Sequence, residues 1–209
     1  MSLAPTSDIP IDLAREAVHA RLRSRAAAHC DRTAVTAREL AARFGVDEQA
    51  AELAGLLHDW SREEPDAALL AYAEMHGISV LDEERAHPYL LHSRVAAEQL
   101  REDFRGIRLD VLSAVAAHTV GVVPMTPLDK VVYIADAIEP ERAYPGVEEL
   151  RETAANCPLD TVFGDVYASS VAFVCEKGAV LHPMTALVAA QVERETGTSP
   201  LCPKDGERP

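Results

Sequence analysis

The sequence has few aromatic residues, few cysteines and no long apolar run. Aromatic residues make up 5% of the 209 positions, which disfavours a β-rich fold. The cysteines, Cys30, Cys157, Cys175 and Cys202, are scattered without a C-x-x-C pair, so neither a disulfide framework nor a zinc knuckle is indicated. No window reaches the roughly 18 apolar residues of a membrane span, and residues 1–10 lack a basic segment followed by an apolar one. We therefore expect a cytoplasmic protein with reduced thiols and no membrane partner.

Positive charge is also scarce. The chain has 34 acidic residues against 20 Lys and Arg, a formal net charge of -14. Because such a surface repels polyanions at long range, we do not expect a nucleic acid partner. A phosphate ester bound by this chain would need positive charge inside its site, which bound metal ions and a few arginines can supply.

What the sequence does contain is alanine and other helix-forming residues, with 48% hydrophobic residues in total. Gly45 is typical of a helix end, and Asp47 and Thr126 are typical N-caps. We predict an all-α bundle with one domain over residues 10–196, preceded by a disordered lead over 1–9 and followed by a flexible tail over 197–209. The expected helices cover residues 10–27, 29–44, 48–58, 65–76, 92–104, 109–119, 127–139, 146–156, 158–178 and 183–195.

Two acidic residues stand where an apolar helix face is expected. His58 and Asp59 directly follow the apolar segment LAGLL, and Asp136 lies on the apolar side of VVYIADAI. A buried carboxylate is costly unless it is paired, and a divalent cation would pair it. For Asp136 two other interpretations stay open, a salt bridge to a buried arginine or an outward orientation.

Three further histidines can face inwards. His29 opens its predicted helix, His118 continues the stripe of Val111 and Val115, and His92 precedes a helix with an apolar face. Helical bundles build metal sites from inward side chains on separate helices. Imidazole and carboxylate ligands suit Zn, Mn, Fe, Co or Ni. Two metals bridged by Asp59 would use all of these residues, and a single metal held by four of them is the alternative.

The order His29, His58-Asp59, Asp136 resembles the HD superfamily of metal-dependent phosphohydrolases. The segments LAGLLHDWSREEP, LLHSRVAAE, AAHTVG and LDKVVYIADAIEPERAYPGVEELR resemble the YqeK family within it, and the resemblance extends over residues 11–195. It implies an HD-type helical fold, iron at the metal centre and symmetrical hydrolysis of diadenosine tetraphosphate to two ADP.

The resemblance also implies roles for individual residues. Its metal ligands correspond to His29, His58, Asp59 and Asp136, and its additional histidines, which hold a second metal or touch phosphate, correspond to His92 and His118. In this interpretation Asp59 and His118 are catalytic: Asp59 orients the attacking, metal-activated water, and His118 contacts a phosphate oxygen or donates a proton.

Three residues outside the metal ligands correspond to substrate contacts. Arg142 lies in the EP-x-R segment and is expected to bind phosphate. Arg62 stands where the family often has Lys, which keeps the charge and changes the geometry. His182 lies in the segment 178–185, which resembles the family's loop near the nucleotide.

Other functions remain open from the sequence. The expected partner is a dinucleoside polyphosphate or an ADP-like nucleotide. The same metal site can also serve a nucleotidase, a phosphodiesterase or a hydrolase of an alarmone such as guanosine tetraphosphate. A nucleotide sensor without catalysis and an acidic helical scaffold with incidental histidines are the alternatives outside enzymes. The sequence also leaves a monomer and a homodimer open.

Overall fold

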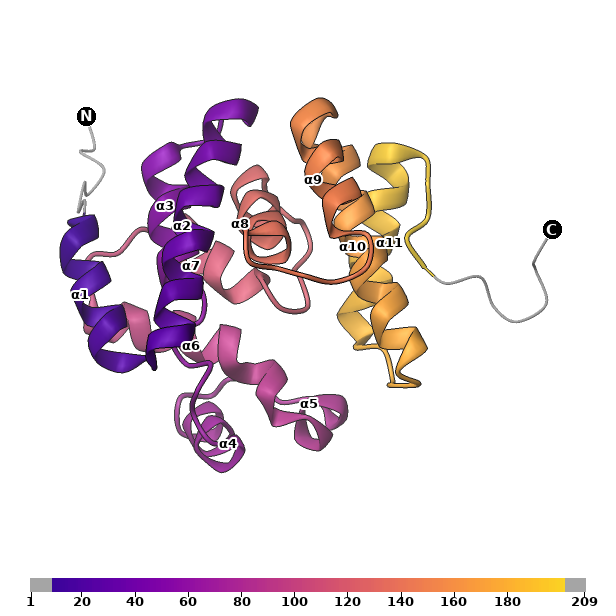
Figure 1. The fold of residues 1–209 in the computed structure, drawn as a ribbon. Helices are drawn as coiled ribbons and strands as arrows, with labels where there is room; N and C mark the ends of the chain where they lie inside the picture. Colours follow the sequence, from indigo (N-terminus) through magenta and orange to yellow (C-terminus); the bar gives the residue numbers. More distant parts are fainter. Residues whose placement is uncertain (1–8, 202–209) are drawn as a thin grey trace, which may run out of the picture.

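The computed structural model describes residues 9–201, and these residues form helices and no strand, which confirms the predicted all-α class (Figure 1). The α-helices are α1 (Ile11–Arg21), α2 (Ser24–Phe44), α3 (Glu48–Leu57), α4 (Asp66–Met75), α5 (Asp82–Ala86), α6 (His92–Asp103), α7 (Leu109–Ala117), α8 (Pro127–Ile138), α9 (Val147–Asn156), α10 (Leu159–Glu176) and α11 (Pro183–Thr196), with a 3-10 helix η1 (Pro88–Leu91) before α6.

Helix α8 lies at the centre of the fold. It contacts α2, α3, α7 and α10, and Figure 1 shows it between the α2–α3 pair and the α9–α11 group. Val131, Val132, Ile134 and Ala135 are completely buried, so α8 is enclosed on several sides. A polar side chain near the end of this helix therefore lies among other helices and not on an open surface.

The local signals for α8 and α3 act as predicted. The Thr126 hydroxyl accepts from the backbone N–H of Asp129, whose carboxylate accepts from the N–H of Thr126. Pro127 occupies the first helical position, where its missing N–H costs nothing. The carboxylate of Asp47 caps α3 by accepting from the N–H groups of Gln49 and Ala50.

The expected helix over 10–27 is wrong in its extent. It ends at Arg21, and α2 begins at Ser24, because Leu22 and Arg23 are extended with ψ 152 at both residues. The N–H of Arg23 donates to the Glu63 carboxylate at 2.8 Å, a contact from a distant part of the chain. Neither Gly nor Pro occurs at this break, so the sequence contains no local signal for it. The break coincides instead with the tertiary contact to Glu63.

A second difference lies between Gly77 and His92, where no helix was expected. The structure has α5 and η1 there, and the buried Glu84 side chain caps α5 by accepting from the N–H of Leu81 at 2.9 Å. Leu91 contributes to a small apolar cluster that connects α4, η1 and α6. This segment leads directly into His92.

Helices α2 and α3 approach closely at Gly55. A Cβ placed on Gly55 would lie 3.0 Å from the backbone oxygen of Thr33 and 3.1 Å from the Cα of Ala34. By contrast, a Cβ on Gly164 of α10 would meet only side-chain atoms, the nearest at 3.1 Å. Side-chain ends can move aside more easily than a helix backbone can.

We expect Gly55→Ala to destabilise the protein by about 1–3 kcal/mol, because overpacking against backbone forces the two helices apart. Gly164→Ala is the matched control and should change the free energy of unfolding less, since the helix propensity gained offsets the side-chain adjustment. Denaturant unfolding monitored by circular dichroism measures both variants. Equal stability of Gly55→Ala and wild type would contradict the close approach.

Of the expected lead, residues 1–9, and the expected tail, residues 197–209, the parts over 1–8 and 202–209 lie outside the described residues. Where the structure does describe the end of α11, Gly197 stops the helix with φ 77. Among residues 9–201, no helix combines the length and the apolarity that a bilayer crossing requires.

Candidate metal centre

The structure gathers the expected metal ligands near helix ends. His58 and His118 follow the last residues of α3 and α7, Asp59 comes directly after His58, and His92 is the first residue of α6. Asp136 lies in the last turn of α8. His29 does not open its helix as expected: it is in the second turn of α2, because that helix begins earlier, at Ser24.

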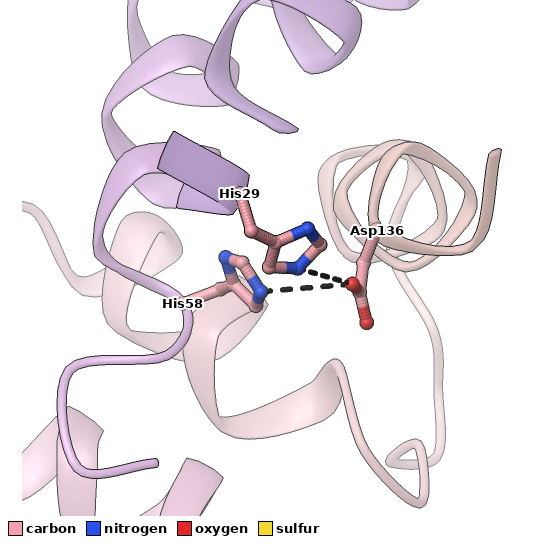
Figure 2. Close-up of side chains that lie close together, drawn as sticks. All are labelled: His29, His58 and Asp136. Carbon is pink, nitrogen blue, oxygen red and sulfur yellow. Dashed lines mark ion pairs between the residues drawn. The ribbon is translucent and has the colours of Figure 1, made fainter. Parts of the chain in front are cut away.

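His29, His58 and Asp136 form the first group of side chains (Figure 2). One potential ligand atom from each of them lies within 4.8 Å of the other two. The Asp136 Oδ1 atom is 2.9 Å from His29 Nε2 and 3.7 Å from His58 Nε2, as the dashed lines in Figure 2 mark. Ligands bound at roughly 2.1 Å to a tetrahedral metal are about 3.3 Å apart, so these separations fit a metal site.

Asp59 is the centre of the second group, which contains His58 and His118, with potential ligand atoms again within 4.8 Å. The two oxygens of Asp59 face different neighbours. Oδ2 lies 3.5 Å from His58 Nε2, whereas Oδ1 lies 3.3 Å from His92 Nε2 and 3.5 Å from His118 Nε2. The carboxylate therefore lies between the first group and the pair of His92 and His118.

Three imidazoles are oriented by backbone carbonyl groups three residues earlier. The Nδ1–H groups of His58, His92 and His118 donate to the carbonyls of Gly55, Tyr89 and Val115 at 2.8, 2.5 and 2.7 Å. Nε2 is then the atom of each ring that is left for a further partner, a metal ion or a second proton. The three carbonyls lie at the ends of α3, η1 and α7, where C=O groups lack their usual intrahelical partner, and that of Tyr89 also accepts from the backbone N–H of His92.

These Nε2 atoms meet in a way that fits a cation. His58 Nε2 is buried without a hydrogen-bond partner among residues 9–201, and the Nε2 atoms of His92 and His118 are only 3.0 Å apart, with the Thr119 hydroxyl 3.3 Å from each. A buried nitrogen without a partner and two ring nitrogens this close are both unfavourable unless a proton or a metal ion lies beside them. Imidazole nitrogens with carboxylate oxygens are a donor set for a divalent transition metal.

The carboxylates of buried Asp59 and half-buried Asp136 remain ionised. Burial alone would raise the pKa of Asp59, but the surrounding imidazoles, led by His58, hold it well below its usual range. Burial also opposes the ionisation of Asp136, yet His29, His58 and Arg142 lower its pKa. Two negative charges are thus held together inside the protein, which favours a cation beside them.

Burial and the charge of the two carboxylates shift the pKa values of the neighbouring groups. Burial lowers the pKa of His58, but the Asp59 and Asp136 carboxylates outweigh this and raise it to about 9. For His118 burial prevails and lowers the pKa, which keeps the ring neutral. Burial, together with the Asp59 and Asp136 charges, raises the pKa of the Cys30 thiol and keeps it protonated.

Arg142 lies at the first group, where a phosphate contact is expected. Its Nε donates to the Asp136 backbone oxygen at 2.8 Å, and its terminal nitrogen contacts the Asp136 carboxylate and lies 3.3 Å from His29 Nε2. The side chain is 40% exposed, so part of the guanidinium faces outwards. Asp136 therefore pairs with an arginine that is not buried, unlike the arginine of the alternative interpretation, and it also contacts the histidines.

Two residues near the site were missed by the sequence analysis. Glu139 accepts from His29 Nδ1 at 3.1 Å and from Arg32 Nε at 2.6 Å. Although burial opposes ionisation, the Arg32 contact lowers the pKa of Glu139 to about 2. A signal was present: Arg32 is three residues after His29 on α2, and Glu139 is three residues after Asp136.

The other two expected substrate contacts, Arg62 and His182, have surroundings unlike those of Arg142. Arg62 is exposed, and its side chain makes no hydrogen bond or ion pair within residues 9–201. His182 is the N-cap of α11: its Nδ1 accepts from the N–H of Met184 at 3.1 Å, and its Nε2 lies 3.3 Å from the buried Glu84 carboxylate. Both ring nitrogens of His182 thus have partners in the protein.

A helical bundle with imidazoles and carboxylates converging between its central helices defines a candidate metalloprotein. Residues 26–141 match the family model described as the HD domain, and the chain belongs to the HD-domain family. This membership implies a divalent metal.

The relatives and a solved structure agree with this assignment. A protein of Bacillus subtilis named "Bis(5'-nucleosyl)-tetraphosphatase, symmetrical" is 36% identical over 73% of this chain and 81% of its own length. A protein of the same name from Halalkalibacterium halodurans is 34% identical over 72% of this chain and 79% of its own. The crystal structure of a predicted HD superfamily hydrolase involved in NAD metabolism from Clostridium acetobutylicum has a TM-score of 0.83 and 30% identity, and the match covers 90% of this chain and 99% of that one. The resemblance to the YqeK family is confirmed.

Proposed function

We propose that this chain is a metal-dependent hydrolase that cleaves diadenosine tetraphosphate symmetrically into two ADP. The relatives named for this activity are similar over most of both chains. The observation that carries the proposal is that backbone carbonyls hold the Nδ1–H groups of His58, His92 and His118 and so direct all three Nε2 atoms at Asp59. That arrangement suits a metal centre of the kind that phosphoanhydride hydrolysis uses.

We further propose that all six converging side chains are ligands: His29, His58, Asp59, His92, His118 and Asp136. The division of the Asp59 oxygens between His58 on one side and His92 and His118 on the other supports a bridging carboxylate and two ions. Iron is the proposed metal, and the nitrogen and oxygen donors also suit Mn, Co, Ni or Zn.

When bound, a divalent cation supplies Lewis acidity toward phosphoryl oxygens and a lower pKa for water. The protein supplies position and charge. Asp59 would orient the attacking water, and His118 would hold the second metal or, where only one is bound, contact a phosphate oxygen. The outward part of the Arg142 guanidinium binds phosphate. Arg62, without a partner in the described part of the chain, and His182 are further proposed contacts.

A product assay tests this function. Diadenosine tetraphosphate is incubated with the full-length protein and added Fe²⁺ or Mn²⁺, and the nucleotides are separated by ion-exchange chromatography. We expect two ADP for each substrate consumed, because water attacks the central phosphoanhydride. ATP with AMP would contradict symmetrical cleavage. Turnover of guanosine tetraphosphate alone would favour an alarmone hydrolase, and binding of nucleotide without turnover would favour a sensor.

A further inference from the structure

We propose that Glu139, held in place by Arg32, is a positioning residue that fixes the orientation and tautomer of His29 as a metal ligand. The inference rests on the proposed metal centre. It assigns a function to a buried carboxylate and an arginine that do not themselves contact the converging ligand atoms. Its basis is the set of hydrogen bonds that Glu139 makes and a difference between His29 and the other three histidines.

The Glu139 carboxylate is fully engaged. Its side chain is 3% exposed. Oε1 accepts from His29 Nδ1 at 3.1 Å, and Oε2 accepts from Arg32 Nε at 2.6 Å and from the backbone N–H of Glu141 at 2.9 Å. The second guanidinium nitrogen of Arg32 lies 3.4 Å from Oε1. Arg32 and the backbone thus fix the carboxylate in a single position, with one oxygen directed at His29.

His29 differs from the other three imidazoles in its place on the helix. His58, His92 and His118 directly follow α3, η1 and α7, and each donates its Nδ1–H to the carbonyl three residues earlier, in the last turn of that helix. His29 is in the second turn of a helix that continues to Phe44, where the carbonyls are used by the helix itself. Its Nδ1–H therefore needs an acceptor from another element, and Glu139 at the end of α8 provides it.

The consequence for His29 is chemical as well as geometric. With a proton fixed on Nδ1, Nε2 is the atom directed at the ligand group, 2.9 Å from Asp136 Oδ1 and 3.3 Å from the terminal nitrogen of Arg142. A carboxylate that accepts from the far nitrogen of a ligating imidazole raises its basicity and holds its plane. Arg32 lies on α2, like His29, and its guanidinium contacts both carboxylate oxygens of Glu139. The orientation of the His29 ring relative to α2 is therefore fixed by its own attachment to α2 and, through Glu139, by Arg32.

The test compares Glu139→Gln with Glu141→Gln in the full-length protein. Both substitutions remove a negative charge that pairs with Arg32, since Glu141 lies 3.1 Å from it and is exposed, but only Glu139 contacts His29. Cobalt binding is measured by competition with a chelator and by the visible spectrum of the bound Co²⁺. We expect Glu139→Gln to bind Co²⁺ about 10- to 100-fold more weakly, with a changed spectrum, and Glu141→Gln to resemble wild type.

A double substitution separates positioning from general structural support. In the His29→Ala background no imidazole remains to be positioned, so Glu139→Gln should weaken Co²⁺ binding no further. An equal loss in both backgrounds would overturn the inference, as would wild-type affinity in folded Glu139→Gln. If Glu139→Gln does not fold, Arg32→Lys, which keeps the charge and loses the fork, should still weaken binding. Wild-type affinity in that variant would likewise overturn it. Absence of Co²⁺ binding by wild type would instead refute the metal centre itself.

Discussion

Asp59→Asn is expected to reduce hydrolysis of diadenosine tetraphosphate about a thousandfold or more, because it removes the charge that holds the second group of ligands together. The carboxylate lies 3.3–3.5 Å from the Nε2 atoms of His58, His92 and His118. Asparagine has the same shape as aspartate but no charge, so the loss of hydrolysis rate measures what the charge of Asp59 contributes. The rate is measured from ADP formation at saturating metal.

Folding must be preserved for this result to be informative. Circular dichroism should show a helical spectrum like that of wild type, because Asp59 makes its side-chain contacts within the site and not in the apolar core. Asp165→Asn is the matched control, since Asp165 is exposed on α10, and this variant should keep full activity. Full activity in Asp59→Asn would rule out the proposed site.

Most of the helices could be predicted because their signals are local. A capping box with Pro127 defines the start of α8, Asp47 caps α3, and Gly45 ends α2 in the left-handed conformation. The break at residues 22–23 could not be predicted in the same way. It accompanies a contact between the Arg23 N–H and Glu63, and such a contact exists only once the fold has formed.

The convergence of the proposed ligands could be predicted from the cost of burying charge. His58, Asp59 and Asp136 lie beside apolar helix faces, and the structure places them within the two groups. What the sequence does not contain is the orientation of each ring. That depends on the carbonyls of Gly55, Tyr89 and Val115, and a backbone atom has no signature in the sequence.

Glu139 shows the limit of pattern reasoning most clearly. Charged residues usually lie at the surface, and a glutamate just before a proline indicates a helix end that is exposed to solvent. Here the carboxylate is buried because Arg32 and His29, more than a hundred residues away in the chain, both donate to it. Only the packing of α2 against α8 brings the three together.

A divalent metal should stabilise the folded protein strongly. Without one, the like charges of buried Asp59 and half-buried Asp136 both lie beside His58, whose Nε2 has no hydrogen-bond partner in the described part of the chain. A ligand that binds only the folded state stabilises it by about 4 kcal/mol at a thousand times its Kd. For a chain of this length, that corresponds to an increase in Tm of about 8–16 °C.

Differential scanning calorimetry measures this shift by comparing chelator-treated protein with the same sample after Mn²⁺ or Co²⁺ is added at saturation. His58→Ala should lose most of the increase, because His58 belongs to both groups of ligands. His87→Ala, an exposed histidine outside both groups, should keep it. The same Tm for wild type with and without metal would mean that the buried carboxylates are balanced by Arg142 and the histidines alone, and the metal centre would have to be abandoned.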